Sequence, residues 1–189
     1  MWDRRLVEKL EEAVGDFSVS CRFRNVRDNF EWAFTGVYGP NVDREKRLMW
    51  EELAGLYSWW NLPWCVGGDF NTICFPSERL GAENFTQGMY NFSNFTSING
   101  LMDIPLEGGS YTWSNSLFGS RIDRFLFSLE WEKHFPTIHQ KRLVIVLLDH
   151  FSISLEGADI RKGCRLFHFE NMWLQVDNLV EKVKIWWDS

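Results

Sequence analysis

Six polar residues stand at expected strand ends or on the polar faces of expected strands, and their types suit the hydrolysis of a phosphodiester. Residues 63–72 read PWCVGGDFNT, so Asp69 and Asn71 follow an apolar run that ends in two glycines. The others are Tyr38, Asp123, Asp149 and His150. Metal-assisted hydrolysis needs carboxylates to hold a cation, a group that aligns water, and donors that neutralise phosphoryl oxygens. The set offers each of these, although every member alone is also a common turn or strand-end residue.

The composition indicates one folded domain with a large core. The chain has 189 residues, of which 45% are hydrophobic, with 11 Trp and 16 Phe among them, which argues against a disordered chain. The formal net charge of -6 gives no general attraction for nucleic acid, although a metal-neutralised acidic site could still bind a phosphodiester. The four cysteines are scattered and lack zinc-binding spacing.

Neither a secretory signal nor a membrane span is predicted. The first residues, MWDRRLVEKLEEAVG, are charged throughout and contain no apolar h-region. The longest apolar run, residues 143–148, is too short to cross a bilayer. We therefore expect an intracellular protein, nuclear or cytoplasmic and not secreted, with no membrane partner.

Strands and helices are expected to bring the polar residues together. Alternation predicts a strand over 31–38 that ends at Tyr38, a short buried strand over 64–67, a strand over 120–128, and a further strand that carries His150. Asp43 can cap a helix, and a second helix is predicted over 87–99. The expected buried stripes of these helices are Met49, Leu53, Leu56 and Trp60, and Met89, Phe92, Phe95 and Ile98. Asp123 shares a strand face with aromatic residues, so it needs a partner.

The order of the elements favours a layered sandwich. Helices and strands are mixed without a strict β-α-β rhythm, so the fold class is α/β in the broad sense, or α+β, and not a doubly wound sheet. We expect a domain over 1–155, a linker over 156–170, and an amphipathic helix over 171–189. The spacing that predicts this helix is that of Trp173, Val176, Val180, Val183 and Trp187.

An ordered set of motifs resembles the endonuclease/exonuclease/phosphatase superfamily, which includes apurinic/apyrimidinic endonucleases and pancreatic deoxyribonuclease. The motifs are GVYGPN, WCVGGDFN, YTWSN, SRIDRFL and LLDHFSISL. With SERLG at 77–81, they are most similar to the endonuclease domain of plant LINE-type (non-LTR) retrotransposons. The resemblance implies a four-layer α/β/β/α sandwich of the DNase I-like type, Mg²⁺ or Mn²⁺ as cofactor, and double-stranded DNA as substrate. It also implies that residues 171–189 connect to a reverse transcriptase domain.

The resemblance also implies roles for the six residues. Tyr38 would hydrogen-bond the scissile phosphate, Asp69 would orient or deprotonate the attacking water, and Asn71 would hold phosphoryl oxygens. Asp123 would accept a hydrogen bond from His150 and fix its tautomer, while His150 contacts the phosphate. Asp149 would lie at or beside the metal, with Asp69 as the other metal-binding carboxylate.

Further residues are expected around this site. Candidate DNA contacts are Asn41, Arg79, Arg121, Arg124 and, near the same rim, Arg142. The alternative for these arginines is an ordinary solvated or salt-bridged surface. Trp113 could support the site by stacking on substrate, although burial in the core is the more common position of a tryptophan.

The sequence departs from the family pattern in two places. The family carries an Asn and a metal-binding Glu on strands upstream of the segment that matches MWDRRLVEKL, and no acid between Glu8 and Asp28 replaces that Glu. We therefore expect an N-terminally truncated sandwich with its first strands missing, and weak binding of Mg²⁺. Leu148 also stands where the family usually has Ser.

Three functions remain open from the sequence. The first is a Mg²⁺-dependent DNA-nicking endonuclease impaired by truncation, and the second is a catalytically inactive transposon remnant or binding module. Because of the missing Glu, the sequence leaves open whether the chain is an enzyme. The third is a phosphatase of the same superfamily, which Ile73 disfavours because an inositol phosphatase commonly has Arg there.

Overall fold

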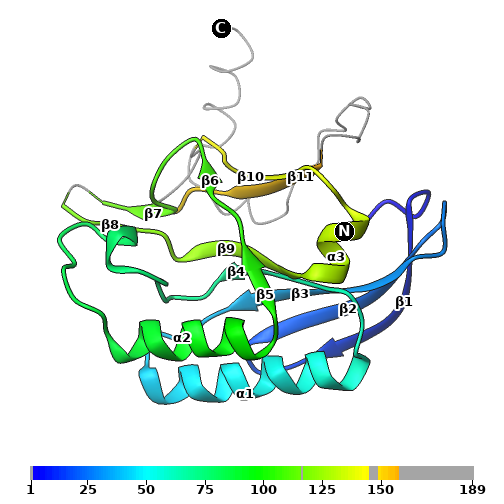
Figure 1. Cartoon of the computed structure of the whole chain (residues 1–189), viewed down its shortest axis with the longest axis horizontal. Coiled ribbons are helices and arrows are strands. Elements are labelled where there is room, and N and C mark those ends of the chain that lie inside the picture. Colours follow the sequence, from blue (N-terminus) through cyan, green and yellow to red (C-terminus); the bar gives the residue numbers. More distant parts are fainter. Residues whose placement is uncertain (1, 116, 145–148, 158–189) are drawn as a thin grey trace, which may run out of the picture. The chain divides into compact units, whose positions relative to one another are not determined.

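The computed structural model describes residues 2–115, 117–144 and 149–157 (Figure 1). The helix predicted over 171–189 lies outside the described residues, as does the predicted linker from residue 158 onward. The first two residues of that linker, Glu156 and Gly157, belong to a strand. Within the described part of the chain, no helix is long and apolar enough to cross a bilayer.

A six-stranded sheet forms the centre of the domain, with strand order β1-β2-β3-β4-β9-β5. The strands are β1 (Val7–Val14), β2 (Ser18–Asn25), β3 (Glu31–Tyr38), β4 (Trp64–Asp69), β9 (Asp123–Ser128) and β5 (Leu101–Asp103). β3 and β4 run parallel, and all other neighbours are antiparallel. β3 ends at Tyr38 as predicted, and its alternate residues Ala33, Thr35 and Val37 are buried. β1 and β2 are not among the strands expected from the sequence.

Two helices cover one face of this sheet (Figure 1). They are α1 (Asp43–Trp60) and α2 (Gln87–Ile98). Met49, Leu53 and Phe92 have no exposed surface and belong to the core between the helices and the sheet. Two details of the expectation are wrong: the N-cap of α1 is Val42, without a side-chain cap, and not Asp43. Ile98 is 73% exposed because the buried stripe of α2 ends at Phe95.

A smaller sheet lies over the opposite face (Figure 1). Its order is β11-β10-β6, with β11 at Ile153–Gly157, β10 at Ile138–Arg142 and β6 at Leu106–Glu107. The buried cluster on this side consists of Cys65 of β4, Phe127 of β9 and Trp131 of the short helix α3 (Leu129–His134). The buried Gln140 joins the two sheets, because its Oε1 accepts from the Phe125 amide at 2.6 Å. Helices, large sheet and small sheet are thus three layers of the expected α/β sandwich.

Short segments complete the end of the sheet where β3 and β4 terminate. β7 (Trp113–Ser114) and β8 (Gly119–Ser120) pair as a hairpin, and η1 (Pro76–Glu78) is a single 3₁₀ turn. The strand expected over 120–128 is therefore divided between β8 and β9. His150 precedes β11 and forms an isolated bridge with Trp113.

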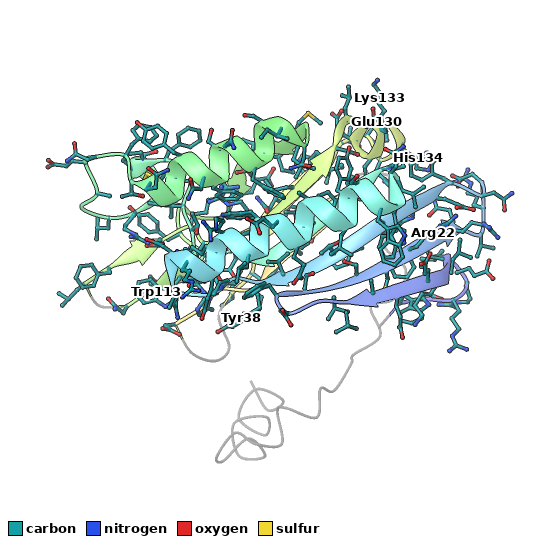
Figure 2. All side chains as sticks on the ribbon, turned by 90° about the horizontal axis from the view of Figure 1, so that it is seen from below. Arg22, Tyr38, Trp113, Glu130, Lys133 and His134 are labelled. Carbon is teal, nitrogen blue, oxygen red and sulfur yellow. The ribbon has the colours of Figure 1, made fainter. Side chains whose placement is uncertain are left out.

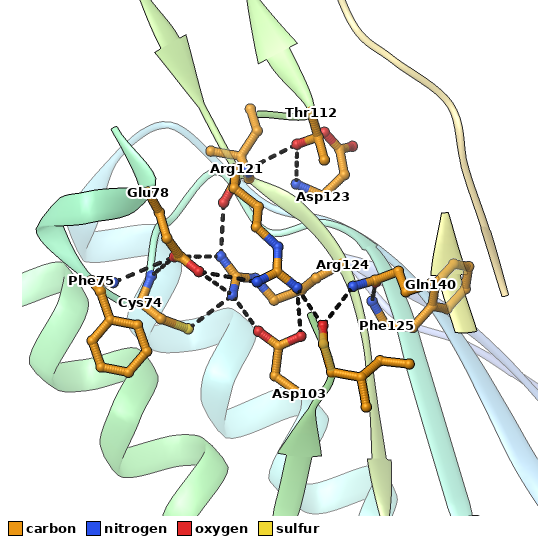
Figure 3. Close-up of polar contacts among 12 residues, drawn as sticks. Cys74, Phe75, Glu78, Asp103, Thr112, Arg121, Asp123, Arg124, Phe125 and Gln140 are labelled. Carbon is orange, nitrogen blue, oxygen red and sulfur yellow. Dashed lines mark hydrogen bonds and ion pairs between the residues drawn. The ribbon is translucent and has the colours of Figure 1, made fainter. Parts of the chain in front are cut away.

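A buried cation anchors β9 on the helical side of the sheet (Figure 3). Arg124 has no exposed surface, and its guanidinium donates to Asp103 Oδ2 at 2.7 Å and to Glu78 Oε2 at 2.9 Å. Arg121 binds the same two carboxylates, at 2.7 Å and 3.3 Å. Both side chains are held inside the fold by acids, so the prediction that Arg121 and Arg124 contact DNA is wrong.

Glu78 connects this network to the turn η1. Its Oε2 accepts from the backbone N–H of Cys74 at 2.6 Å. Burial acts to raise the pKa of Glu78, but the hydrogen bond and charge of Arg124 outweigh burial and hold that pKa below its ordinary value. Cys74, Glu78 and Asp103 lie close enough to hold a metal, yet the two guanidinium groups already neutralise their carboxylates. The cluster is therefore structural.

We predict that Glu78→Gln lowers the free energy of unfolding by about 3 kcal/mol at neutral pH, the low end for a broken buried pair because Asp103 still faces Arg124. Since the folded-state pKa of Glu78 is lowered, its contribution is present above the unfolded-state pKa and is lost as pH falls through the folded-state value. Urea unfolding from pH 7 downward measures both effects. The exposed Glu83→Gln should change stability by less than about 0.5 kcal/mol; equal effects of the two substitutions would contradict the assignment.

Candidate active site

The register of three strands places Tyr38, Asp69 and Asp123 in one row. In the parallel pair β3 and β4, Tyr38 is the partner of Asp69. In the antiparallel pair β4 and β9, Asp69 is the partner of Asp123. Directly opposed residues of neighbouring strands share a face of the sheet. The structure therefore brings together three of the six residues through main-chain pairing alone.

Two glycines allow the outer strands to approach β4 this closely. A Cβ on Gly67 would lie 2.2 Å from the ring of Phe125 on β9. Gly68 has a φ of +143°, and a Cβ there would lie 2.1 Å from the carbonyl oxygen of Val37 on β3. A side chain at position 68 would force the backbone of β3 away, and one at position 67 would displace the Phe125 ring. The pair Gly67-Gly68 is therefore a requirement of the row and not a turn.

A cavity of about 710 Å³ lies beside the row. Its lining residues are Tyr38, Asn41, Lys46, Asp69, Asn71, Arg79, Trp113, Phe118, Ser120, Ile122 and His150. Figure 2 shows Tyr38 and Trp113 at the same end of the large sheet, away from the labelled residues of α3. The cavity thus takes residues from β3, β4, the β7–β8 hairpin, and the segment before β11.

A tight turn after β4 fixes Asp69 and Asn71 relative to each other. Asn71 is in the left-handed region at φ 48°, and its backbone N–H donates to Asp69 Oδ1 at 2.7 Å. Its side-chain amide donates to the carbonyl of Gly39 at 2.6 Å, while the Gly39 N–H donates to the carbonyl of Asp69 at 2.6 Å. These bonds hold the turn after Tyr38 against the turn after Asp69. Within the described part of the chain, one side-chain amide hydrogen and the side-chain carbonyl oxygen of Asn71 remain for a ligand.

Asp123 and His150 form the second half of the site. The Nδ1 of His150 lies 3.4 Å from Asp123 Oδ2. The buried Thr112 supports both residues, since its Oγ1 accepts from the Asp123 N–H at 2.9 Å and its carbonyl accepts from the Phe151 N–H at 2.7 Å. Thr112 was not among the expected site residues, although its place in the YTWSN motif was a signal.

The two row carboxylates are destabilised as anions. Burial raises the pKa of Asp69, and the negative charge of Asp123 raises it further, against the hydrogen bond from Asn71. Burial also raises the pKa of Asp123, against its hydrogen bond with Thr112 and the charge of His150. Among the described residues, the buried Asp123 Oδ2 has the ion-pair contact with His150 at 3.4 Å but no hydrogen bond. A positive ligand between the two carboxylates would relieve both conflicts.

These donors fit a divalent cation. One oxygen from each of Asp69 and Asp123 and one ring nitrogen of His150 lie within 4.8 Å of one another. The expected second carboxylate, Asp149, is outside this group, because its Oδ2 accepts a hydrogen bond from Trp113 Nε1 at 2.7 Å. The two carboxylates that could hold a cation in the structure are therefore Asp69 and Asp123, whereas the sequence analysis expected Asp69 and Asp149.

The remaining expected residues divide between the cavity and the scaffold. Asn41 and Arg79 line the cavity, and Arg79 Nε donates to Ser120 Oγ at 3.1 Å. Arg142 instead donates to two loop carbonyls, at 3.0 and 3.2 Å. Trp113 fills both expected positions, since it lines the cavity and packs against a small core cluster.

Two residues that line the cavity, Lys46 and Phe118, belong to none of the motifs recognised in the sequence. Lys46 lies in the first turn of α1, where a lysine reads as an ordinary solvated residue. Phe118 lies in the β7–β8 hairpin and is more than half exposed. Ser120 and Ile122, by contrast, lie within the quoted motif SRIDRFL and could have been nominated with Asp123.

We predict that Asp69→Asn stabilises the fold at pH 7. Because its folded-state pKa is raised, the wild type loses stability as pH rises from the ordinary aspartate pKa of 3.8 through the raised value, and asparagine removes this loss while keeping the acceptor for Asn71. Guanidinium unfolding from pH 4 to 7 should show the two proteins diverging as pH rises. A variant less stable than wild type at pH 7 would contradict the burial of charge; the exposed Asp16→Asn is the control and should track wild type.

Solved structures of known proteins share this fold. The endonuclease domain of TRAS1, a telomere-specific non-LTR retrotransposon, is 14% identical with a TM-score of 0.66, covering 85% of this chain and 72% of that chain. The AP endonuclease LMAP from Leishmania major is 18% identical with a TM-score of 0.58, covering 80% of this chain and 61% of that chain. A mannosyl-6-phosphatase from Bacteroides thetaiotaomicron is 19% identical with a TM-score of 0.50, covering 82% and 68%. No curated protein matches the sequence.

The sequence profile of the Endonuclease/Exonuclease/phosphatase family matches residues 2–145. This range contains the complete row of Tyr38, Asp69 and Asp123. The profile and the sandwich of sheets and helices agree with each other. The chain belongs to the endonuclease/exonuclease/phosphatase family and has its DNase I-like fold.

Proposed function

We propose that this chain is a DNA-nicking endonuclease domain of non-LTR (LINE-type) retrotransposon origin, which hydrolyses phosphodiesters with Mg²⁺ or Mn²⁺. The observation that carries the proposal is the row of Tyr38, Asp69 and Asp123, with His150 beside it on a cavity of about 710 Å³. Two acids, an imidazole and a phenol at one rim match the needs of phosphodiester hydrolysis.

Asp69 is the proposed acceptor of the proton from water. In the reaction a water oxygen attacks phosphorus, one P–O bond breaks, the water proton passes to Asp69, and the leaving oxygen takes up a proton. Asp69 is 9% exposed and lines the cavity, which places a proton acceptor beside the proposed cation site. Asn71 keeps Asp69 Oδ1 fixed through its backbone N–H.

Phosphoryl oxygens are bound by the other residues of the rim. Asp123 holds His150 at Nδ1, and when the imidazole is protonated at both nitrogens its Nε2–H can donate to a phosphoryl oxygen. Tyr38 is exposed at the end of β3, where its hydroxyl is available as a further donor. Arg79, the cavity arginine, supplies a positive charge for the DNA backbone.

Asp69 and Asp123 would hold the divalent cation. When bound, the cation would lower the pKa of water and neutralise charge that develops on the phosphoryl group. Mg²⁺ is commonly bound in proteins through one or two carboxylates together with substrate phosphates and water. The proposed role of Asp149 is to support the site through Trp113, whose indole N–H it accepts.

The motif resemblance favours DNA over a smaller phosphate ester as the substrate. Two of the three similar folds described above are named as endonucleases, including one from a non-LTR retrotransposon. The third is named as a sugar phosphatase, so phosphomonoester hydrolysis is the competing activity. A reverse transcriptase domain of the parent element is the proposed protein partner, in keeping with the motif resemblance.

A supercoiled-plasmid nicking assay with Mg²⁺ or Mn²⁺ tests the proposal. Wild type should nick, EDTA should abolish nicking, and Asp123→Ala should lower the rate by about 100-fold or more because both the cation site and the orientation of His150 are lost. The exposed Asp16→Ala should nick as wild type does. Circular dichroism establishes that each variant is folded.

Three results would contradict the proposal. Equal nicking by Asp123→Ala would remove the assigned site. A folded wild type that never nicks would identify the chain as an inactive or purely binding member of the family. Release of phosphate from a sugar phosphate, without nicking, would identify the phosphatase activity.

A further inference from the structure

Lys46 is a cavity residue without an assigned role. Resting on the proposed function, we infer that Lys46 binds a phosphate of the substrate strand at the cavity wall formed by the start of α1. The positive charge is carried by the chain itself and is independent of any metal. The site therefore has a positively charged side chain of its own on the side of Asp69 that faces α1.

The position of Lys46 follows from the turn that ends β3. Tyr38 is the last residue of β3, and α1 begins at Asp43. The Lys46 N–H donates to the carbonyl of Val42 at 3.0 Å, which fixes it in the first helical turn. Lys46 lines the cavity together with Tyr38, Asn41 and Asp69. The same turn thus supplies both the phenol of the row and this lysine.

The Lys46 side chain is withdrawn from solvent without a strong partner. It is 14% exposed. In the described part of the chain, its ion-pair contact is Asp43 Oδ1 at 3.6 Å, and the Asp43 side chain is 83% exposed. Such a long, solvated pair contributes little, and an ammonium group is strongly hydrated when free. An anionic ligand in the cavity would offset the loss of that hydration.

The other basic groups of the cavity each have a side-chain partner in its walls and keep further N–H groups for the substrate. His150 is paired with Asp123, and Arg79 Nε donates to Ser120. Among the described residues, the ion-pair partner of Lys46 is the mostly exposed Asp43, whereas the partner of His150 is the largely buried Asp123. Its charge is felt at Asp69, where it opposes the rise in pKa that burial causes. A phosphate entering beside Asp69 meets a carboxylate, and Lys46 reduces that repulsion.

The neighbouring residue provides a matched control. Arg47 carries the same charge on the same helix, but its side chain is 70% exposed, pairs with Glu51 at 3.8 Å and does not line the cavity. Substitution of Arg47 changes the net charge of the protein by the same amount as substitution of Lys46. Any difference between the two variants therefore reports the position of the charge.

The test is the salt dependence of binding to a duplex oligonucleotide in EDTA, measured by fluorescence anisotropy. Loss of one phosphate contact should reduce the slope of log K against log salt concentration by about 0.9. We expect this change for Lys46→Gln, a slope close to wild type for Lys46→Arg, and no change for Arg47→Gln. An unchanged slope for Lys46→Gln, or the same reduction for Arg47→Gln, would overturn the inference.

Competition with inorganic phosphate identifies the source of the anion. If free phosphate displaces the duplex from wild type but not from Lys46→Gln, the lysine site accepts an isolated phosphate. If free phosphate has no effect while the slope still changes, the site requires the DNA backbone. A wild type that does not nick but shows the Lys46-dependent slope would reject hydrolysis and keep the phosphate site. A wild type that nicks, with Lys46→Gln identical in slope, would reject only the lysine.

Discussion

The close approach of β3 and β9 to the two glycines of β4 is the constraint on which the site depends. Side chains at Gly67 and Gly68 would collide with Phe125 and with the backbone of Val37. The hydrogen-bonded register then sets Asp69 between its two partners in the row. A slip of one residue would turn β4's polar end toward the helices. The stretch PWCVGGDFN is therefore the end of a central strand built to carry an active site.

Adjacent residues of β9 separate the chemistry from the scaffold. Asp123 faces the cavity side of the sheet, while Arg124 faces the helices, where it is neutralised by Glu78 and Asp103. The scaffold pairs its buried arginines with carboxylates. The carboxylates of the site are not paired in this way, since Asp69 and Asp123 have raised pKa values and share one imidazole. The buried carboxylates of the row lower the free energy of unfolding at the place where a cation and a phosphate are proposed to bind.

Local patterns predicted the elements that run through the site. The alternation of 31–38 and the stripe that contains Met49 and Leu53 both correspond to observed elements. β1 was missed because its sequence, VEKLEEAV, is dense in charge. Its acids pair with arginines of β2, as in Glu8 with Arg24 and Glu11 with Arg22, and no single strand reveals such pairing. Residues Arg121 and Arg124 were misplaced for the same reason, because their carboxylates come from segments remote in sequence. Lys46 could be recognised only once α1 was set beside Asp69.

Titration of the Asp69 and Asp123 carboxyl groups by ¹³C NMR, with and without Mg²⁺, tests the central claim most directly. Without metal, both groups should titrate above the ordinary aspartate pKa of 3.8, because burial opposes the ionisation of each and the charge of Asp123 further opposes that of Asp69. With Mg²⁺, both midpoints should fall, because the cation favours the ionised pair. Midpoints at or below 3.8 that do not respond to Mg²⁺ would show that the row is neither buried as described nor a cation site.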